Sequence, residues 1–172
     1  MGRTTGELTM TVKDTTLEQD TLVRFEKRQI QEPRVLNEAY DYDNPVPFTR
    51  ALRVELPGYS LILISGTASV NEAGESIHIG DLEAQSWRTF RNIEALLAAE
   101  RADWHDVVRT TCYLRDMSRD YDAFNEVRMA FYQQKELDPF PASTGIQVTL
   151  CREDLLVEIE AMAIVPPDRK AT

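Results

Sequence analysis

Residues 155–165 read LLVEIEAMAIV, and the two sides of this stretch differ in character. Alternation with a period of two predicts a β-strand, whose successive side chains point to opposite faces of a sheet. One set is wholly apolar and should face a core: Leu155, Val157, Ile159, Ala161 and Ala163. The other set mixes carboxylates with apolar groups: Leu156, Glu158, Glu160, Met162 and Ile164. A subunit interface would accommodate both kinds of side chain in the second set, so the strand predicts oligomerisation.

Six earlier segments have the periodicity of strands or helices. They are predicted strands at residues 50–56, 60–65, 107–114 and 144–150, and predicted helices from Asp81 to about residue 101 and from about residue 118 to the prolines within 137–141. With the final strand, the order is β-β-α-β-α-β-β. Right-handed crossovers would place both helices on one face of a mixed sheet, which is an α+β fold.

Three of these segments carry apolar side chains that should meet the core. They are Trp87, Phe90, Ile93 and Leu97 in the first helix, Val108, Thr110, Cys112 and Leu114 in the third strand, and Tyr121, Phe124, Val127 and Phe131 in the second helix. The helical sets recur at steps of three and four residues, and the strand set recurs at steps of two. Both helices should therefore pack on the sheet.

The length of 172 residues fits one domain. The regular pattern covers residues 46–166, which we take as the domain, and residues 167–172 are a tail. Residues 1–45 differ, because short alternating stretches at 9–12 and 22–26 enclose a polar segment. They predict an N-terminal arm with one or two strands, docked on the domain or on a neighbouring subunit.

The composition argues against several classes of function. The net charge is −10, with 19 basic residues scattered among 29 acidic ones, which does not favour a nucleic-acid partner. The sequence has neither an apolar run that would span a bilayer nor the apolar stretch of a signal peptide, so we expect a soluble cytoplasmic protein without a membrane partner. Two cysteines and two histidines, without a cluster of metal-ligand spacing, predict neither disulfide framework nor bound metal, and no cofactor is expected.

Six short motifs occur in order between residues 47 and 165. They are PFTRA at 47–51, LISGT at 63–67, GDLEAQ at 80–85 followed by NI at 92–93, DVVRTTCYLRDM at 106–117, FN and FY at 124–125 and 131–132, and VEIEA at 157–161. No single motif is specific, but six in this order are hard to obtain by chance. On these residues the chain resembles the RidA/YjgF family.

The resemblance implies an assembly and a chemistry. Family members are similar in forming homotrimers, with sheets packed around a central barrel and small-molecule clefts between subunits. Many are enamine or imine deaminases that hydrolyse reactive intermediates such as 2-aminoacrylate. Older descriptions call some of them endoribonucleases or translation inhibitors, which the acidic composition does not favour. We therefore expect a homotrimer that binds a small, carboxylate-bearing molecule.

One motif departs from that of the deaminases. Their P-A-R motif supplies a guanidinium that binds the substrate carboxylate in a bidentate manner. Here residues 141–145 read PASTG, so Ser143 stands at the arginine position and is followed by Thr144 and Gly145. A hydroxyl supplies no fixed charge. Arg115, at the end of the third strand, is a candidate replacement, and the alternative for it is a solvated charge.

A second resemblance is to the C-terminal half of chorismatases, which hydrolyse an enolpyruvyl ether. It rests on ISGTAS at 64–69, on GD at 80–81 with Gln85, and on CREDLLVEIE at 151–160. In that branch a cysteine and a glutamate line the site, and they match Cys151 and Glu158. The alternative for Cys151 is inert packing.

These motifs yield one catalytic candidate and ten substrate-binding candidates. Glu158 is the catalytic candidate, because partial burial could raise its pKa and let it activate water, whereas the alternative is an ion pair across the trimer. Glu160 has the same parity, but for it an ion pair between subunits is the preferred hypothesis. The substrate-binding candidates are Phe48, Ser65, Gly66, Thr67, Arg115, Asn125, Ser143, Thr144, Gly145 and Cys151.

Three of these candidates have specific expectations. Phe48 can stack on a ligand but cannot donate a proton. Gly66 could let backbone N–H groups approach a ligand, or could mark a strand irregularity. For Asn125 a structural role that orders a loop is preferred.

Two functions remain open from the sequence. The first is a trimeric RidA-type hydrolase or deaminase that acts on an imine, enamine or enol metabolite, with Glu158 handling the water. The alternative is a non-catalytic small-molecule binding or regulatory protein with the same clefts.

Overall fold

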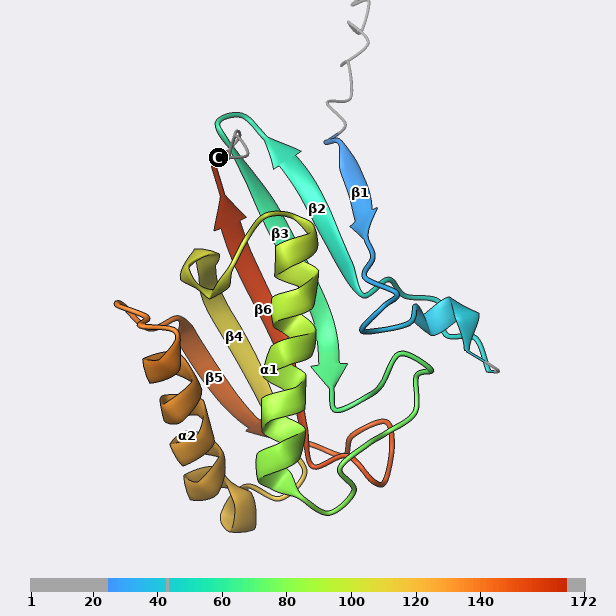
Figure 1. Ribbon diagram of the computed structural model, residues 1–172, viewed down its shortest axis with the longest axis vertical. Helices are drawn as coiled ribbons and strands as arrows, with labels where there is room; N and C mark the ends of the chain where they lie inside the picture. The colour runs from blue at the N-terminus through green and yellow to red at the C-terminus, as the bar shows by residue number, and fades with distance from the viewer. Residues whose placement is uncertain (1–24, 43, 167–172) are drawn as a thin grey trace, which may run out of the picture.

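The computed structural model describes residues 25–42 and 44–166. It contains six strands, two α-helices and two short 3-10 helices (Figure 1). The strands are β1 (Lys27–Ile30), β2 (Ala51–Leu56), β3 (Tyr59–Ala68), β4 (Val107–Leu114), β5 (Ala142–Gln147) and β6 (Val157–Val165). The helices are α1 (Leu82–Ala99), α2 (Met117–Gln134), η1 (Ala39–Asp41) and η2 (Trp104–Asp106).

The strands form one mixed sheet in the order β1-β2-β3-β6-β4-β5. β4 and β5 are parallel, and all other neighbours are antiparallel. The predicted mixed sheet with two helices is confirmed. β1 lies within the stretch assigned to the N-terminal arm and begins one residue after the predicted strand at 22–26. It pairs with the free edge of β2. The other arm strand, at 9–12, lies outside the described residues.

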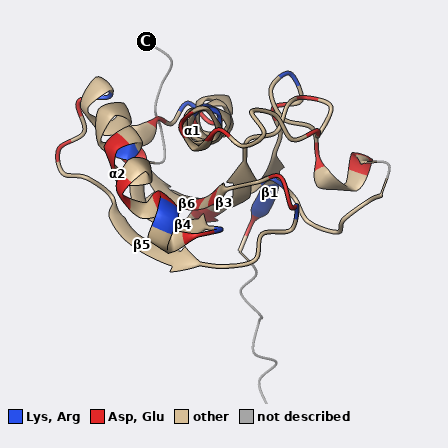
Figure 2. Ribbon diagram, turned by 90° about the horizontal axis from the view of Figure 1, so that it is seen from below, with Lys and Arg blue, Asp and Glu red and all other residues tan. Residues whose placement is uncertain are grey.

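Both helices lie on one face of the sheet, as Figure 1 shows from the front and Figure 2 from below. α1 begins after Asp81, whose carboxylate accepts a hydrogen bond from the Ala84 backbone N–H at 2.9 Å. Its Phe90 ring stacks on Phe131 of α2 at a centroid distance of 4.6 Å. The two helices and the sheet thereby share one aromatic core.

β6 alternates as its sequence predicts. Its residues with odd numbers are buried against the helices, and its even-numbered residues are half-buried or exposed. No helix of the described segments covers that second face (Figure 2). It carries apolar groups such as Met162 and Ile164 as well as the carboxylates of Glu158 and Glu160.

Two of the predicted core residues lie at the surface. Val108 is 41% exposed because the pairing of β4 with β6 shifts by one residue between Val107 and Arg109, and such a bulge turns side chains to the other face. Tyr121 is 45% exposed, at the edge of the α2 stripe. The remaining core positions of the two helices are buried, apart from Trp87, which is partly buried.

β5 differs from its predicted position and is unusually exposed. It begins at Ala142, two residues before the predicted start, so Ser143, Thr144 and Gly145 all lie within it. Every residue of β5 is exposed in the single chain, and it forms an edge of the sheet. Exposed edges with apolar side chains such as Ile146 are surfaces on which another chain can pair. Among the described residues, no helix has the length and apolar character needed to cross a membrane.

Candidate functional site

A cleft of about 850 Å³ opens where β3 and β6 meet the loops before β2, after β3 and before β6. It brings together five of the sequence candidates: Phe48, Ser65, Gly66, Cys151 and Glu158. Some of the other lining residues are apolar, such as Val46, Val70 and Leu155, and others are polar or charged: Asp41, Tyr42, Asn44, Arg50, Glu75 and Arg152. The cleft thus combines apolar surface with several polar and charged groups, as small-molecule sites commonly do.

The floor of the cleft is a β-bulge in β3. Ile64 pairs with Ala161 and Thr67 with Ile159, so β3 contains one extra residue over this interval. Bulges re-aim side chains and are frequent beside active sites. Here the bulge turns both Ser65 and Gly66 toward the cleft.

Gly66 leaves the space that the Glu158 carboxylate occupies. A Cβ added to residue 66 would lie 1.9 Å from Glu158 Oε1 and 2.9 Å from Cδ. The absence of a side chain at Gly66 therefore makes room for the Glu158 carboxylate. Gly66 also lies in a strand irregularity, which was the alternative explanation for this glycine in the sequence.

The Glu158 carboxylate is half-buried and has its pKa raised. Burial is the main cause, Glu160 adds to it, and the charge of Arg50 opposes it. Glu160 itself is exposed and accepts a hydrogen bond from the Tyr113 hydroxyl at 2.9 Å. A carboxyl whose pKa lies nearer neutrality is better suited to exchange protons with water and substrate.

Ser65 and Thr67 have different surroundings. The Ser65 hydroxyl donates to the Thr49 carbonyl at 2.8 Å, which leaves its oxygen lone pairs facing the cleft as acceptors. Thr67 is fully buried and donates to the Ser65 carbonyl at 2.9 Å. Thr67 therefore braces the bulge and does not line the cleft.

The loop that carries Cys151 is held by two side chains from the motifs quoted above, Gln85 and Arg115. Gln85 of α1 donates to the Asp154 carbonyl at 2.8 Å and accepts from the Leu156 N–H at 2.8 Å. Arg115 donates from Nε to the Leu155 carbonyl at 2.6 Å and from Nη2 to the Arg152 carbonyl. Arg115 thus positions the loop, and it is not among the residues that line the cleft.

The cleft residues that were not identified from the sequence include Tyr42, Arg50 and Arg152. The Tyr42 ring contacts both guanidinium groups, with its centre 5.3 Å from Arg50 and 5.5 Å from Arg152. Gly74 makes room for this ring, since a Cβ there would lie 2.3 Å from Tyr42 Cε1. An arginine within the otherwise small and apolar motif PFTRA was the available signal for Arg50.

Arg50 is 4% exposed although it is charged. Its Nε donates to the Asn37 carbonyl at 2.9 Å, and its guanidinium lies 5.4 Å from the centre of the Phe48 ring. Nη2 is buried and has no hydrogen-bond partner among the described residues. Burial lowers the pKa of Arg50 to about 10, so the group is still charged at neutral pH.

The remaining candidates form a second group on β5 and α2. Arg128 of α2 donates to the Ser143 hydroxyl at 3.0 Å and to the Asn125 side-chain oxygen. Thr144 accepts a hydrogen bond from Arg109 at 3.1 Å, and a Cβ added at Gly145 would lie 3.6 Å from the side chains of Tyr121 and Met117. In the single chain, this second group does not line the cleft.

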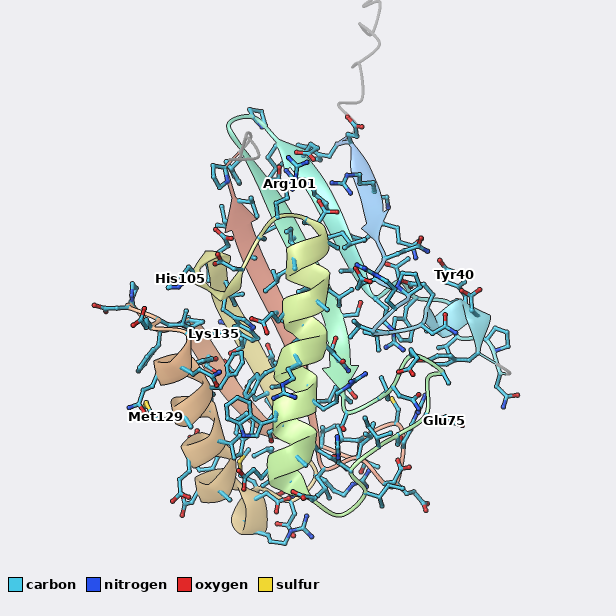
Figure 3. The ribbon with its side chains drawn as sticks, viewed as in Figure 1. Tyr40, Glu75, Arg101, His105, Met129 and Lys135 are labelled. Carbon is cyan, nitrogen blue, oxygen red and sulfur yellow. The ribbon has the colours of Figure 1, made fainter. Side chains whose placement is uncertain are left out.

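β4 separates the second group from Glu158. Glu158 pairs with Tyr113 of β4, which in turn pairs with Ile146 of β5, so two strand spacings, or roughly 10 Å, separate the two sides. Figure 3 shows Glu75, which lines the cleft, and Met129 of α2 on opposite sides of the molecule.

Within residues 25–42 and 44–166, no group of three or more His, Cys, Asp or Glu side chains could hold a metal ion. The lining residues of the cleft carry three carboxylates, the hydroxyls of a serine and a tyrosine, a thiol and two guanidinium groups.

Comparison with known proteins agrees with the fold and the motifs. A family model described as endoribonuclease L-PSP matches residues 43–165. A RutC family protein of Pyrococcus abyssi is 31% identical over 118 residues, which cover 68% of this chain and 85% of that protein. A 2-iminobutanoate/2-iminopropanoate deaminase of Mus musculus is 29% identical over 125 residues, covering 73% and 86%.

Solved structures give the same assignment. The crystal structure of the YjgF gene product of E. coli superposes with a TM-score of 0.64 at 27% identity, covering 80% of this chain and 98% of that one. The chain therefore belongs to the RidA/YjgF family, the family described as endoribonuclease L-PSP.

Proposed function

We propose that this protein hydrolyses a small imine, enamine or enol metabolite, with Glu158 as the residue that activates water. The observation that carries the proposal is the Glu158 carboxylate, which is set into the cleft above Gly66 with its pKa raised by burial. The names of relatives support the reaction class, because one of them is a 2-iminobutanoate/2-iminopropanoate deaminase.

The chemistry assigned to Glu158 is general acid–base catalysis. Its carboxylate accepts a proton from water as the water oxygen bonds to the carbon of the protonated imine, and the C=N electron pair moves to nitrogen, which gives a neutral carbinolamine. The same carboxyl then gives its proton to nitrogen as the carbon–nitrogen bond breaks, and takes the hydroxyl proton as the C=O bond forms. The products are a carbonyl compound and ammonia, which leaves with the remaining proton as ammonium, so one water is consumed for each imine.

We further propose that the working unit is a homotrimer in the cytoplasm, built from residues 46–166 of each chain with the N-terminal arm added. Two surfaces support this proposal. The face of β6 that carries Met162 and Ile164 lacks cover within the described residues, and β5 is exposed along its length. In such a trimer, the cleft of one copy would lie against the neighbouring copy, where Ser143, Thr144, Gly145 and Asn125 could complete it.

The alternative is a binding protein that retains the cleft without turnover. Ser143 favours it, because the deaminase arginine is missing and the Ser143 hydroxyl is occupied by Arg128. Hydrolysis of 2-iminopropanoate, generated in situ and followed by ammonia release, separates the two functions. The proposed hydrolase accelerates this reaction over buffer and loses the acceleration in Glu158→Gln, whereas a binding protein shows no acceleration in either form.

A further inference from the structure

The cleft contains a buried cation whose hydrogen-bonding capacity is not used up. Arg50 is 4% exposed, and its Nη2 has no hydrogen-bond partner in the described part of the chain. None of the ion pairs within 4.0 Å among residues 25–42 and 44–166 involves Arg50. Glu38, a buried acid whose Oε2 accepts from the Arg50 backbone N–H at 3.1 Å, acts on the Arg50 guanidinium through its charge. A buried N–H without an acceptor is costly, and an anion that accepts from Nη2 would relieve that cost.

The other arginines near the two candidate groups are engaged. Arg115 binds two backbone carbonyls. Arg152 donates to the Gly74 carbonyl at 2.7 Å and to the Ser76 hydroxyl at 3.3 Å. Arg128 is held by Ser143 and Asn125 outside the cleft. Of these cations, Arg50 alone lines the cleft and has a buried donor without a partner.

Arg50 also has a useful relation to the proposed catalytic carboxylate. Arg50 and Glu158 line the same cleft, and each shifts the pKa of the other through its charge. A ligand whose carboxylate binds Arg50 can therefore present an adjacent carbon toward Glu158. This arrangement is that of a 2-imino acid, in which the imine carbon is bonded to the carboxylate carbon.

Part of the lining is suited to an apolar group. Val46, Phe48, Val70 and Leu155 line the cleft, and Phe48 is 37% exposed, while Asp41, Asn44, Glu75 and Arg152 form polar parts of the wall. A cleft of about 850 Å³ is large for an acid of three carbon atoms and falls in the range of sites that bind drug-sized molecules. An aromatic or branched side chain on the ligand would bury this apolar surface.

We infer that Arg50 is the carboxylate-binding residue of the cleft, and that its ligand is a 2-imino or 2-oxo acid with an apolar side chain larger than a methyl group. This inference rests on the proposed function and names its substrate class. In the deaminases an arginine at the position of Ser143 binds the substrate carboxylate. Here Arg50 takes that role, and it lies directly before β2 in the same cleft as Glu158. Its planar guanidinium can bind a carboxylate through two parallel hydrogen bonds.

The test is calorimetric binding of phenylpyruvate and of its methyl ester, which lacks the charge. The wild type should bind the acid roughly ten- to hundredfold more tightly than the ester, as expected for charge-assisted hydrogen bonds. Arg50→Gln should lose this preference and keep its affinity for the ester. Arg50→Lys should retain part of it, because the charge remains without the planar pair of donors. Pyruvate should bind more weakly than phenylpyruvate.

Arg91→Gln is the control, since it removes an exposed guanidinium of α1 that does not line the cleft. It should leave the preference for the acid unchanged. A wild type that does not distinguish acid from ester, or that binds neither, overturns the inference. So does loss of the preference in Arg91→Gln, or its persistence in an Arg50→Gln variant that melts like the wild type. If Arg50→Gln does not fold, Arg50→Lys and the wild-type comparison decide the question.

Binding and turnover can fail separately. If phenylpyruvate binds through Arg50 while no imine is hydrolysed, the inference stands and the proposed hydrolase does not. If imines are hydrolysed at the same rate with and without Arg50, the hydrolase stands and the inference is wrong.

Discussion

Gly66 and Glu158 lie so close together across β3 and β6 that a Cβ on residue 66 would come within 1.9 Å of Glu158 Oε1. Such a contact is impossible, so any side chain at position 66 must displace the carboxylate. The bulge at Ser65–Gly66 and the burial of Glu158 are thus parts of one arrangement. It ties the LISGT motif to the VEIEA motif, which are more than 90 residues apart.

Gly66→Ala should therefore impair the rate of hydrolysis more than it impairs the stability of the folded protein. The displaced carboxylate would leave its catalytic position, and misplacement by about 1 Å costs on the order of a hundredfold in rate. Overpacking at this site should cost about 1–3 kcal/mol in the free energy of unfolding. Gly145→Ala is the stability control, because its new Cβ would meet atoms only at 3.6 Å. Equal rates for Gly66→Ala and wild type would show that the position of Glu158 does not matter.

The raised pKa of Glu158 predicts a pH-dependent effect of Glu158→Gln on stability. Above the unfolded-state pKa, the folded wild type holds the proton more tightly than the unfolded chain, so its stability falls as pH rises toward the folded-state pKa. Glu158→Gln has no carboxyl to titrate at this position, so this fall in stability with rising pH does not occur in the variant. Glu158→Gln should therefore gain in melting temperature relative to wild type between about pH 4.5 and neutrality, with no gain at lower pH.

Glu126→Gln serves as the control for that experiment, because Glu126 is an exposed carboxylate on α2. It should give melting curves that follow the wild type at each pH. A Glu158→Gln variant that is destabilised equally at every pH would contradict the assignment of a destabilising, desolvated carboxylate.

Ser143→Arg should not simply recreate a deaminase site. The new guanidinium would lie beside Arg128, which already donates to the Ser143 hydroxyl at 3.0 Å. Like charges this close should lower stability by about 1–3 kcal/mol, measured by denaturant unfolding. The double variant Arg128→Gln/Ser143→Arg should recover that loss, and should hydrolyse 2-iminopropanoate faster than wild type. Full stability of the single variant would show that Arg128 moves freely away from Ser143.

The oligomeric state can be tested at β5. Light scattering should give three times the 19.7 kDa of one chain for the wild type. Ile146→Lys, which places a charge on the helix-free face in the same row as Glu158, should dissociate the trimer. Met129→Lys is the control, because Met129 is equally apolar and 44% exposed but points outward from α2 (Figure 3). A wild-type monomer would exclude shared clefts.

Much of the fold could be predicted because its signals are local. The helices follow from apolar steps of three and four residues, and the start of α1 follows from its cap Asp81. The two faces of β6 follow from strict alternation. Val108 could not be placed in the same way, since a bulge depends on how two strands pair and leaves no mark in either strand alone.

The site was harder to predict for the same reason. Glu158, Gly66 and Phe48 lie in motifs, and their presence in the cleft follows from those motifs. Arg50 falls in an alternating strand segment, where a charged residue reads as solvent-facing. Its burial comes from contacts with Asn37, Tyr42 and Phe48, which fold over it from the preceding loop. The loop-holding contacts of Arg115 could not be predicted from the sequence, because its carbonyl partners lie 37 and 40 residues away.

The central claim, that Glu158 makes this cleft a hydrolase, is tested most directly by initial rates of imine hydrolysis. The substrates would be the imines of alanine and phenylalanine, generated in situ by an amino-acid oxidase and followed by loss of the imine. The wild type should accelerate hydrolysis over buffer, and Glu158→Gln should return the rate to that of buffer while still binding phenylpyruvate. An amide can hold a water but cannot accept its proton. Equal rates for wild type and Glu158→Gln, or a wild type no faster than buffer, would contradict the claim.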